Sequence, residues 1–398
     1  MNLIDAKNKL PGLVLTAGGA RGAYQAGVLK RMGEIPGLRG KPSPFPIVAG
    51  ASAGAINGSL IAAMSADFSQ GTRRLADVWS EIRFENVFRT DAVRLGSGAL
   101  RWIRDLTFGG LAGGGTVQSL LDATPLRAFL SKVLPLSTLS QAISDGHLYA
   151  LAISATSYYS GKSYTFIQGQ SGHPLWVKSR RISESVSMSV DHICASAAIP
   201  VVFQPVRLKT DAGIFYFGDG GLRLVTPLSP AIRLGADRVF AIGIRSQKSA
   251  EARLRSSLLK ESANEVVMSP PPLAQVFGVS LNAIFLDHLD SDLEHLRRMN
   301  GLIGQSGWSG PDGHEPMRPI DSLAVYPSED LASVAETFGR KMPSLVRYFM
   351  EGLGASYAQS ADLMSYLLFD SSYTKALIDI GYEDAGRQAE EIESYLNR

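Results

Sequence analysis

The sequence has very little cysteine, with Cys194 as its single thiol in 398 residues. One thiol excludes an intrachain disulfide framework, which fits a reducing compartment. The chain also lacks an apolar signal stretch at its start and any run of about 18 apolar residues, so neither a secretory leader nor a transmembrane helix is expected. These absences favour a soluble cytoplasmic protein and leave open peripheral contact with a membrane surface.

A charge excess of either sign is missing as well. Basic residues number 39 and acidic residues 37, for a formal net charge of +2. Without a long Lys/Arg run, the sequence offers no surface for tracking nucleic-acid phosphates. Histidine is scarce too, and none of the six lies in a glycine-flanked strand-end context. A metal site around His288 and His295 is less favoured than a solvated, charged helix face.

Three glycine-rich turns, each preceded by an apolar run typical of a buried strand, are the strongest positive feature. The first spans residues 18–22 (GGARG), the second residues 50–54 (GASAG), and the third residues 219–221 (DGG). Together they predict a serine nucleophile, a backbone oxyanion hole and a carboxylate base, which are the parts required for acyl-ester hydrolysis.

The second turn predicts a nucleophile elbow at Ser52. A pentapeptide of this pattern occurs by chance too often to identify an elbow by itself. The strand-like run before it and the small-residue helix predicted over residues 53–64 supply the strand–turn–helix context that an elbow requires. The flanking Gly50 and Gly54 would let the turn close and the helix pack on the strand. The alternative is a structural Gly-Ser turn.

The first turn predicts an oxyanion hole made of backbone amides, because side chains would obstruct the approach of the developing negative oxygen. Its rival is a nucleotide-binding loop. Ala17 stands where the first glycine of G-x-G-x-x-G belongs, and no P-loop Gly-Lys-Ser/Thr is present. We therefore prefer the oxyanion interpretation for the residues of this turn, which are Gly18, Gly19, Ala20, Arg21 and Gly22.

Asp219 follows a strand and precedes Gly220 and Gly221. It can act as a base if it is desolvated and close to the Ser52 hydroxyl, since a free aspartate is a poor base for an alcohol. The alternative is a turn aspartate bonded to its own backbone. Cys194 lies in an apolar run and is predicted to pack in the core.

Strand-like runs alternate with helical ones, which predicts an α/β fold with a mostly parallel sheet and helices on both faces. Residues 96–116 read as a mobile lid or as a plain surface loop, and residues 247–272 as a linker. A charged helix is expected over residues 281–299. From residue 331 onward the pattern is helical, with breaks expected near Gly352 and Gly381. The predicted strands cover residues 13–16, 45–49, 148–155, 214–217, 239–244 and 320–326.

The combined motifs resemble the patatin-like phospholipase family, in its bacterial type. Besides the three turns, residues 195–200 with Phe203 and Pro205, and the segments 226–230 and 236–240, match the family pattern. Order and spacing agree over residues 11–245 and more weakly to about residue 330. Ala17 in place of glycine is the one departure, and it affects only the expected shape of the oxyanion loop.

The resemblance implies a three-layer fold related to the α/β hydrolases, with a catalytic domain over residues 11–330 and a helical C-terminal extension over 331–398. It implies a Ser52–Asp219 dyad without histidine, an oxyanion hole on the Gly18, Gly19 and Ala20 amides, and no metal or other cofactor. The expected reaction is hydrolysis of phospholipid or other acyl-lipid esters through an acyl-serine intermediate.

Two other functions are compatible with the sequence. A triad esterase would combine Ser52 and Asp219 with one histidine, taken from His288, His295 and His314. A non-catalytic membrane-docking module would use the apolar stripe over residues 331–349, with Arg340, Lys341 and Arg347 facing anionic lipid. For that stripe, a helix packed on its own sheet is the favoured interpretation.

Overall fold

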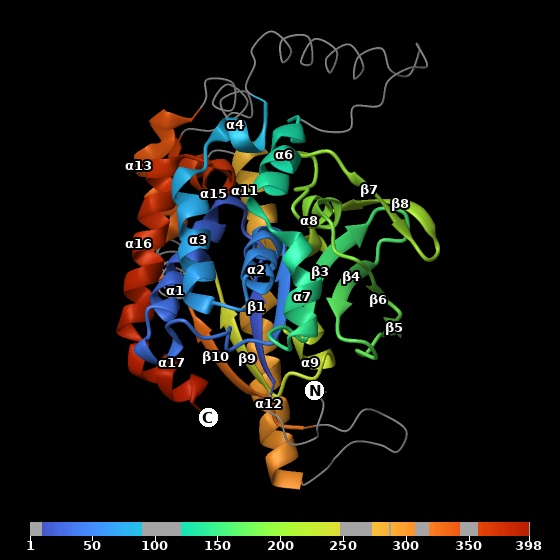
Figure 1. The fold of residues 1–398 in the computed structure, drawn as a ribbon. Coiled ribbons are helices and arrows are strands. Elements are labelled where there is room, and N and C mark those ends of the chain that lie inside the picture. The colour runs from blue at the N-terminus through green and yellow to red at the C-terminus, as the bar shows by residue number, and fades with distance from the viewer. Residues whose placement is uncertain are drawn as a thin grey trace, which may run out of the picture.

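The computed structural model describes residues 10–89, 121–246, 273–285, 288–306, 318–342 and 357–397. A ten-stranded sheet runs through this part of the chain in the order β10-β9-β1-β2-β3-β4-β6-β5, and the β7–β8 hairpin joins it through β3 (Figure 1). The strands are β1 Pro11–Leu15, β2 Ile47–Ala51, β3 Ala150–Ser157, β4 Ser163–Gly169, β5 Val177–Lys178, β6 Arg181–Ser185, β7 Val206–Thr210, β8 Gly213–Gly218, β9 Arg238–Ile242 and β10 Asp321–Val325.

The centre of the sheet is parallel, from β10 through β9, β1 and β2 to β3. Every residue of β2, β3 and β9 is buried, as expected for parallel strands covered on both faces. Beyond β3 the sheet becomes mixed, because β4 and β8 both pair with β3 in the antiparallel sense. The predicted α/β fold with a mostly parallel sheet is confirmed. The six predicted strands match six observed ones to within a few residues, whereas β4, β5, β6 and β7 were not predicted.

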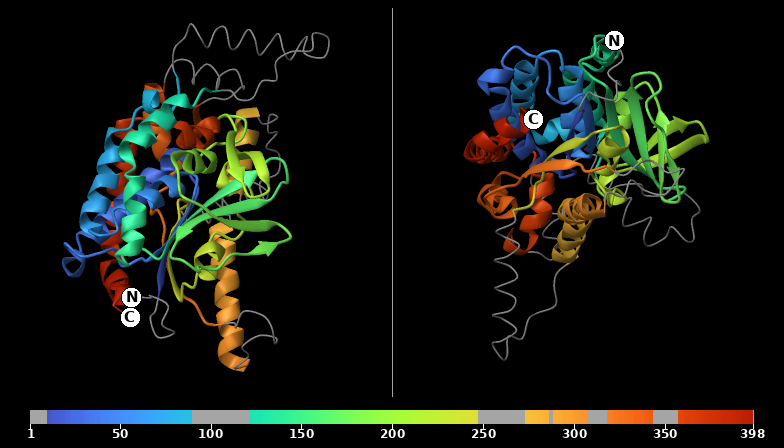
Figure 2. Two further views of the ribbon diagram at one scale, coloured as in Figure 1. Left: turned by 45° about the vertical axis from the view of Figure 1, so that its right-hand side comes forward. Right: turned by 90° about the horizontal axis from the view of Figure 1, so that it is seen from below.

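Helices cover both faces of the sheet and give three layers (Figure 2). Side chains alternate along β1, so that Leu13 and Leu15 face the larger core with α1, α2, α3 and α16, while Val14 faces the smaller core with α9 and α12. The helices are α1 Gly22–Gly33, α2 Ala53–Ala63, α3 Phe68–Glu81, α4 Phe84–Val87, α6 Thr124–Val133, α7 Leu139–Ser144, α8 Val190–Ser196, α9 Ser229–Arg233, α11 Leu273–Phe285, α12 His288–Ser306, α13 Leu331–Phe338, α15 Tyr357–Leu367, α16 Ser371–Arg387 and α17 Ala389–Leu396.

The C-terminal helices belong to the larger core. α16 lies along α1 and α3 (Figure 1), and the Tyr24 hydroxyl donates to Asp384 Oδ2 at 3.1 Å between them. The expected helix break near Gly381 is wrong, because α16 continues through that residue. A Cβ there would collide with the Tyr24 carbonyl, so the glycine permits close helix packing instead. The expected break at Gly352 lies outside the described residues.

Other expectations are met in part. The charged helix of residues 281–299 is replaced by two helices, α11 ending at Phe285 and α12 beginning at His288. The described part of the apolar stripe that starts at residue 331 is packed in the core, with Leu331 and Met342 buried. Cys194 is buried as predicted. The expected lid and linker fall outside the described residues.

In the described part of the chain, no helix is both long and apolar enough to cross a membrane.

Candidate active site

Ser52 occupies a strained turn between β2 and α2. Its φ of 55° and ψ of −124° are rare for a residue with a side chain and cost roughly 1–3 kcal/mol. The flanking glycines are required by close packing: a Cβ on Gly50 would collide with the Gly54 carbonyl, and one on Gly54 with the Leu15 carbonyl. The turn therefore has the strand–elbow–helix geometry that exposes a nucleophile at the end of a strand.

Two further serines hold the elbow in place. The Ser52 amide donates to Ser196 Oγ at 2.9 Å, and Ser196 Oγ donates in turn to the Ser154 carbonyl at 2.6 Å. Both serines are fully buried. Because water does not reach these polar groups, the two hydrogen bonds are what satisfy them. No local sequence signal predicts this role for Ser196, although the residue lies within the segment 195–200 that carries part of the family resemblance.

Asp219 lies at the end of β8 and is 0% exposed. Its amide donates to the Ala198 carbonyl at 2.9 Å, and its own carbonyl accepts from Thr156 Oγ1 at 2.8 Å. The carboxylate Oδ1 accepts from the Gly221 amide at 2.8 Å. These bonds fix the backbone of Asp219 and one carboxylate oxygen, so the orientation of the second oxygen is fixed as well.

That second oxygen, Oδ2, is buried and makes no hydrogen bond of normal geometry to a described residue. The Ser52 hydroxyl nevertheless lies close to the carboxyl group. Burial raises the pKa of Asp219 to about 7, while hydrogen bonding from the Ser52 hydroxyl and the Gly221 amide opposes part of that rise. The Ser52 side chain and the Asp219 carboxyl group are therefore neighbours in the structure.

The predicted oxyanion turn connects β1 to α1 through a short 3₁₀ turn, Gly19–Arg21. Gly19 has a φ of 54°, and the Tyr366 carbonyl of α15 fills the position that a Cβ would need. The Arg21 amide donates to the Gly18 carbonyl at 3.1 Å, and the Gly22 amide to carbonyls within the turn. Within the described residues, the amides of Gly19 and Ala20 have no acceptor, so they can receive an anionic oxygen.

The Arg21 side chain turns away into the protein. Its Nε donates to Ser365 Oγ at 2.8 Å, its NH2 group lies 3.2 Å from Asp362 Oδ1, and its guanidinium stacks over the Tyr366 ring. All three partners belong to α15, far along the chain from the turn. Arg21 therefore couples the turn to the C-terminal region, a role that the local sequence did not reveal.

A buried polar network supports the floor of the site. Asn57 of α2 accepts from Trp79 Nε1 at 2.7 Å and donates to Gln25 Oε1 at 2.9 Å, and Gln25 donates to the Thr16 carbonyl at 3.0 Å. These bonds join α3, α2, α1 and the end of β1 beneath the elbow. Because every member is satisfied, the network fixes the relative positions of these elements.

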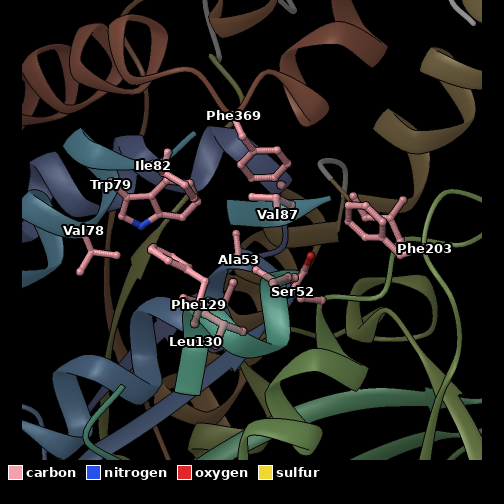
Figure 3. Close-up of a pocket in the computed structure, with 15 residues that line it drawn as sticks. Ser52, Ala53, Val78, Trp79, Ile82, Val87, Phe129, Leu130, Phe203 and Phe369 are labelled. Carbon is pink, nitrogen blue, oxygen red and sulfur yellow. The ribbon is translucent and has the colours of Figure 1, made fainter. Parts of the chain in front are cut away.

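Ser52 lines a narrow pocket (Figure 3). In Figure 3 the Ser52 hydroxyl lies at one side of the pocket and Val78 and Trp79 at the other. Apart from Ser52 the lining is apolar, which suits a hydrocarbon chain. The lining residues are Gly19, Ser52, Ala53, Ile56, Val78, Trp79, Ile82, Val87, Leu126, Phe129, Leu130, Ala197, Ile199, Phe203 and Phe369.

Histidine is not part of this arrangement as far as the chain is described. No described histidine hydrogen-bonds to Ser52 or Asp219. His288 and His295 lie on α12, which packs on the smaller core, whereas the pocket lies on the larger one. His192 is bonded to Ser189 at 2.8 Å, and burial lowers its pKa. His314 lies outside the described residues.

The fold and this site define an α/β protein with a serine at a strand-to-helix elbow beside a buried aspartate. The family model of the patatin-like phospholipases matches residues 13–232. This match covers more than half of the chain, and it includes the first two glycine-rich turns and Asp219. The chain belongs to the patatin-like phospholipase family, which implies lipid ester hydrolase activity.

Solved structures give more distant similarities. VipD from Legionella pneumophila is 13% identical with a TM-score of 0.35, over 96% of this chain and 67% of that one. Human GIVD cytosolic phospholipase A2, in complex with methyl gamma-linolenyl fluorophosphonate, is 12% identical with a TM-score of 0.41. The match covers 98% of this chain but only 58% of the human one. No protein of curated function matches the sequence.

Proposed function

We propose that this protein is a lipid acyl hydrolase of the phospholipase A or lysophospholipase type, with a Ser52–Asp219 dyad. The observation that carries the proposal is the strained Ser52 elbow, which lies close to a fully buried carboxyl group and lines an apolar pocket. Such a pocket can hold an acyl chain while the ester carbonyl lies at the serine.

In the proposed reaction, ionised Asp219 accepts the Ser52 hydroxyl proton through Oδ2 as Oγ attacks the ester carbonyl carbon. The negative carbonyl oxygen of the tetrahedral intermediate would be held by the Gly19 and Ala20 amides. The C–O bond to the alcohol breaks, the proton on Asp219 passes to the leaving alkoxide, and an acyl-serine remains. Water then attacks the acyl-serine carbonyl as Asp219 takes a proton from it. The bond from the acyl carbon to Ser52 Oγ breaks, and Asp219 passes the proton to Oγ, which releases the fatty acid and restores the Ser52 hydroxyl and ionised Asp219.

The catalytic unit that we propose extends beyond residue 330. Phe369 lines the pocket, and α15 supplies the partners of Arg21 behind the oxyanion turn. The family-matched segment alone would therefore lack one wall of the pocket and the support of Gly19. Glycines 50, 54, 220 and 221 act through the backbone, since each stands where a Cβ would collide with a neighbouring group.

A fluorophosphonate probe tests the proposal directly. We expect mass spectrometry to locate the adduct on Ser52 of the wild-type chain. Ser52→Ala should show no adduct, and Asp219→Asn should label far more slowly. Each variant should lose ester hydrolysis by roughly 10⁴-fold or more, as removal of a nucleophile or its base usually does.

Substitution of the histidines one by one provides the control. His147→Gln, His173→Gln, His192→Gln, His288→Gln, His295→Gln and His314→Gln should each retain most of the activity. A single inactive and folded histidine variant would replace the dyad with a triad. Failure of the folded wild-type protein to label or to hydrolyse any acyl ester would overturn the enzymatic proposal.

A further inference from the structure

The β7–β8 hairpin exposes an amphipathic face next to Asp219. In this antiparallel pair Arg207 lies opposite Tyr216, and Lys209 lies opposite Ile214. Directly opposed residues of antiparallel strands project from the same side of a sheet. The four side chains therefore form one surface, on which Ile214 and Tyr216 are 53% and 52% exposed.

Tyr158 extends this surface toward the site. Its amide donates to the Tyr216 carbonyl at 3.0 Å, continuing the pairing of β3 with β8. The phenol lies over Gly218, where a Cβ would collide with its hydroxyl. Burial, with the nearby Asp219 carboxylate as a second cause, raises the pKa of Tyr158. We call the side chains of Tyr158, Arg207, Lys209, Ile214 and Tyr216 the hairpin face.

The opposite side of the hairpin has the reverse character. Leu208 and Phe217 are buried in the larger core, and Phe215 stacks on Tyr159 with ring centres 5.1 Å apart. The hairpin therefore packs against the protein through one side only, and its other side is exposed and available for binding. Large apolar side chains and positively charged side chains lie together on this exposed face. Such a combination is typical of an interaction surface.

The charges on the hairpin face are not neutralised by neighbours. Neither Arg207 nor Lys209 forms an ion pair with another described residue. Arg223 adds a third cation nearby, since its Nε donates to the Gly161 carbonyl in the turn that follows β3. Two acidic side chains lie at the turn between the two strands: Asp211, and Glu184 of β6, whose Oε1 accepts from the Asp211 amide at 2.9 Å. The three cations outnumber these two carboxylates, so the net charge around the hairpin face is positive.

We propose that the hairpin face docks the protein on an anionic lipid bilayer. Tyrosine rings favour the headgroup region, and Ile214 can enter the acyl boundary. Arg207 and Lys209 match the negative charge of anionic headgroups. Position supports a lipid occupant over a protein one: Tyr216 precedes Asp219 by three residues, roughly 10 Å along a strand, so docking brings the bilayer to the site. This last argument rests on the function proposed above.

Vesicle sedimentation with the Ser52→Ala chain tests the docking without interference from hydrolysis. Vesicles would be of phosphatidylcholine alone or of phosphatidylcholine with phosphatidylglycerol at a 3:1 ratio. We expect binding to the anionic vesicles that weakens as salt rises. Arg207→Gln with Lys209→Gln should reduce partitioning about 30-fold, since each cation near an anionic surface is worth about fivefold. Ile214→Ser with Tyr216→Ser should reduce it at least tenfold.

Arg73→Gln with Arg74→Gln is the matched control. Both residues are exposed on α3, which lies on the other side of the molecule from β7 and β8 (Figure 1). This double substitution also removes two positive charges, but away from the hairpin face. It should therefore leave partitioning within about twofold of that of the Ser52→Ala chain. Equal losses in the hairpin and control variants would mean that net charge alone attracts the protein, and would overturn the proposal.

Two substrates separate this proposal from the catalytic one. Hairpin variants should hydrolyse the soluble ester p-nitrophenyl butyrate at the wild-type rate and lose activity only on phospholipid vesicles. Vesicle binding without any hydrolysis would refute the proposed function and leave the docking surface standing. Hydrolysis of vesicles by a wild-type chain that does not bind them would refute the docking surface. So would a dimer in analytical ultracentrifugation that Ile214→Ser with Tyr216→Ser dissociates, since a second copy would then be the occupant.

Discussion

The guanidinium carbon of Arg21 lies 4.4 Å from the centre of the Tyr366 ring, directly behind the oxyanion turn. The Tyr366 carbonyl also occupies the space beside Gly19, and the Tyr366 hydroxyl donates to Asn282 Oδ1 at 2.9 Å. One residue of α15 therefore contacts the turn twice and is itself anchored to α11. This arrangement makes the geometry of the turn depend on residues beyond the family-matched segment.

Arg21→Ala tests that dependence. The substitution leaves Ser365 and Asp362 without their guanidinium partner, and loss of one member of a buried charged pair costs about 3–5 kcal/mol. We expect urea unfolding to report a loss of that order and fluorophosphonate labelling of Ser52 to slow. Arg31→Ala, in the helix α1 that follows the turn, is the control, because Arg31 also contacts a tyrosine ring, Tyr382, but has 39% of its side chain exposed. Equal losses in both variants would contradict the proposed support.

The raised pKa of Asp219 predicts how activity depends on pH. Asp219 can accept a proton only when ionised, and its pKa is about 7. We therefore expect kcat/KM to rise about tenfold per pH unit below pH 7 and to level off above it. A stopped assay with a soluble ester checks this from pH 5 to 9. A histidine would titrate in a similar range, so the profile must persist in the histidine variants, and a profile flat down to pH 5 would contradict the assignment.

The same carboxyl group affects stability with a definite sign. Its pKa is about 7 in the folded chain, above the ordinary aspartate value of 3.8. Between these two values the folded state holds a proton that the unfolded state has released, so stability falls as pH rises from about 4 to 7. Asp219→Asn removes that cost and keeps an acceptor for the Gly221 amide.

We expect Asp219→Asn to be more stable than the wild type at pH 8 by on the order of 2–4 kcal/mol, and nearly equal to it at pH 4. Chemical denaturation at the two pH values measures the difference. If the variant were less stable at pH 8, the carboxylate would be stabilised in the folded state instead of being merely tolerated there.

Ser196 is expected to maintain the elbow. Ser196→Ala leaves the Ser52 amide and the Ser154 carbonyl without their shared partner in a fully buried place, which costs about 1–3 kcal/mol. Since the elbow would also relax, kcat should fall more than KM changes. Ser59→Ala is the matched control, because Ser59 Oγ is buried with no hydrogen-bond partner among the described residues. That control should be neutral or stabilising, and an equal loss of stability in both variants would exclude a specific role for Ser196.

The parts of the site that follow their own local signals could be predicted from the sequence. Ser52 and Asp219 each lie in a glycine-rich turn after an apolar strand, and the turn itself enforces their positions. Ser196 and Tyr366 have no such signal, because their roles arise from contacts between segments far apart in the chain. Gly381 shows the reverse error: the local pattern predicted a helix break, whereas the packing of α16 on Tyr24 decided the outcome. Edge strands such as β7 were not predicted, because charged side chains on one face interrupt the apolar run by which a strand is recognised.

Val78 offers a test of the pocket as an acyl site. It is buried on α3 and lies at the side of the pocket away from Ser52 in Figure 3. Val78→Phe would fill that part of the pocket and block a long chain, while a short chain would still reach the serine. We expect kcat/KM for a palmitoyl ester to fall about 10-fold or more, as a loss of roughly 1.4 kcal/mol or more of transition-state binding implies. The butyryl ester serves as the internal control and should change by less than about threefold. A parallel decline for both esters would indicate general damage to the fold, and no decline for either would place the acyl chain elsewhere.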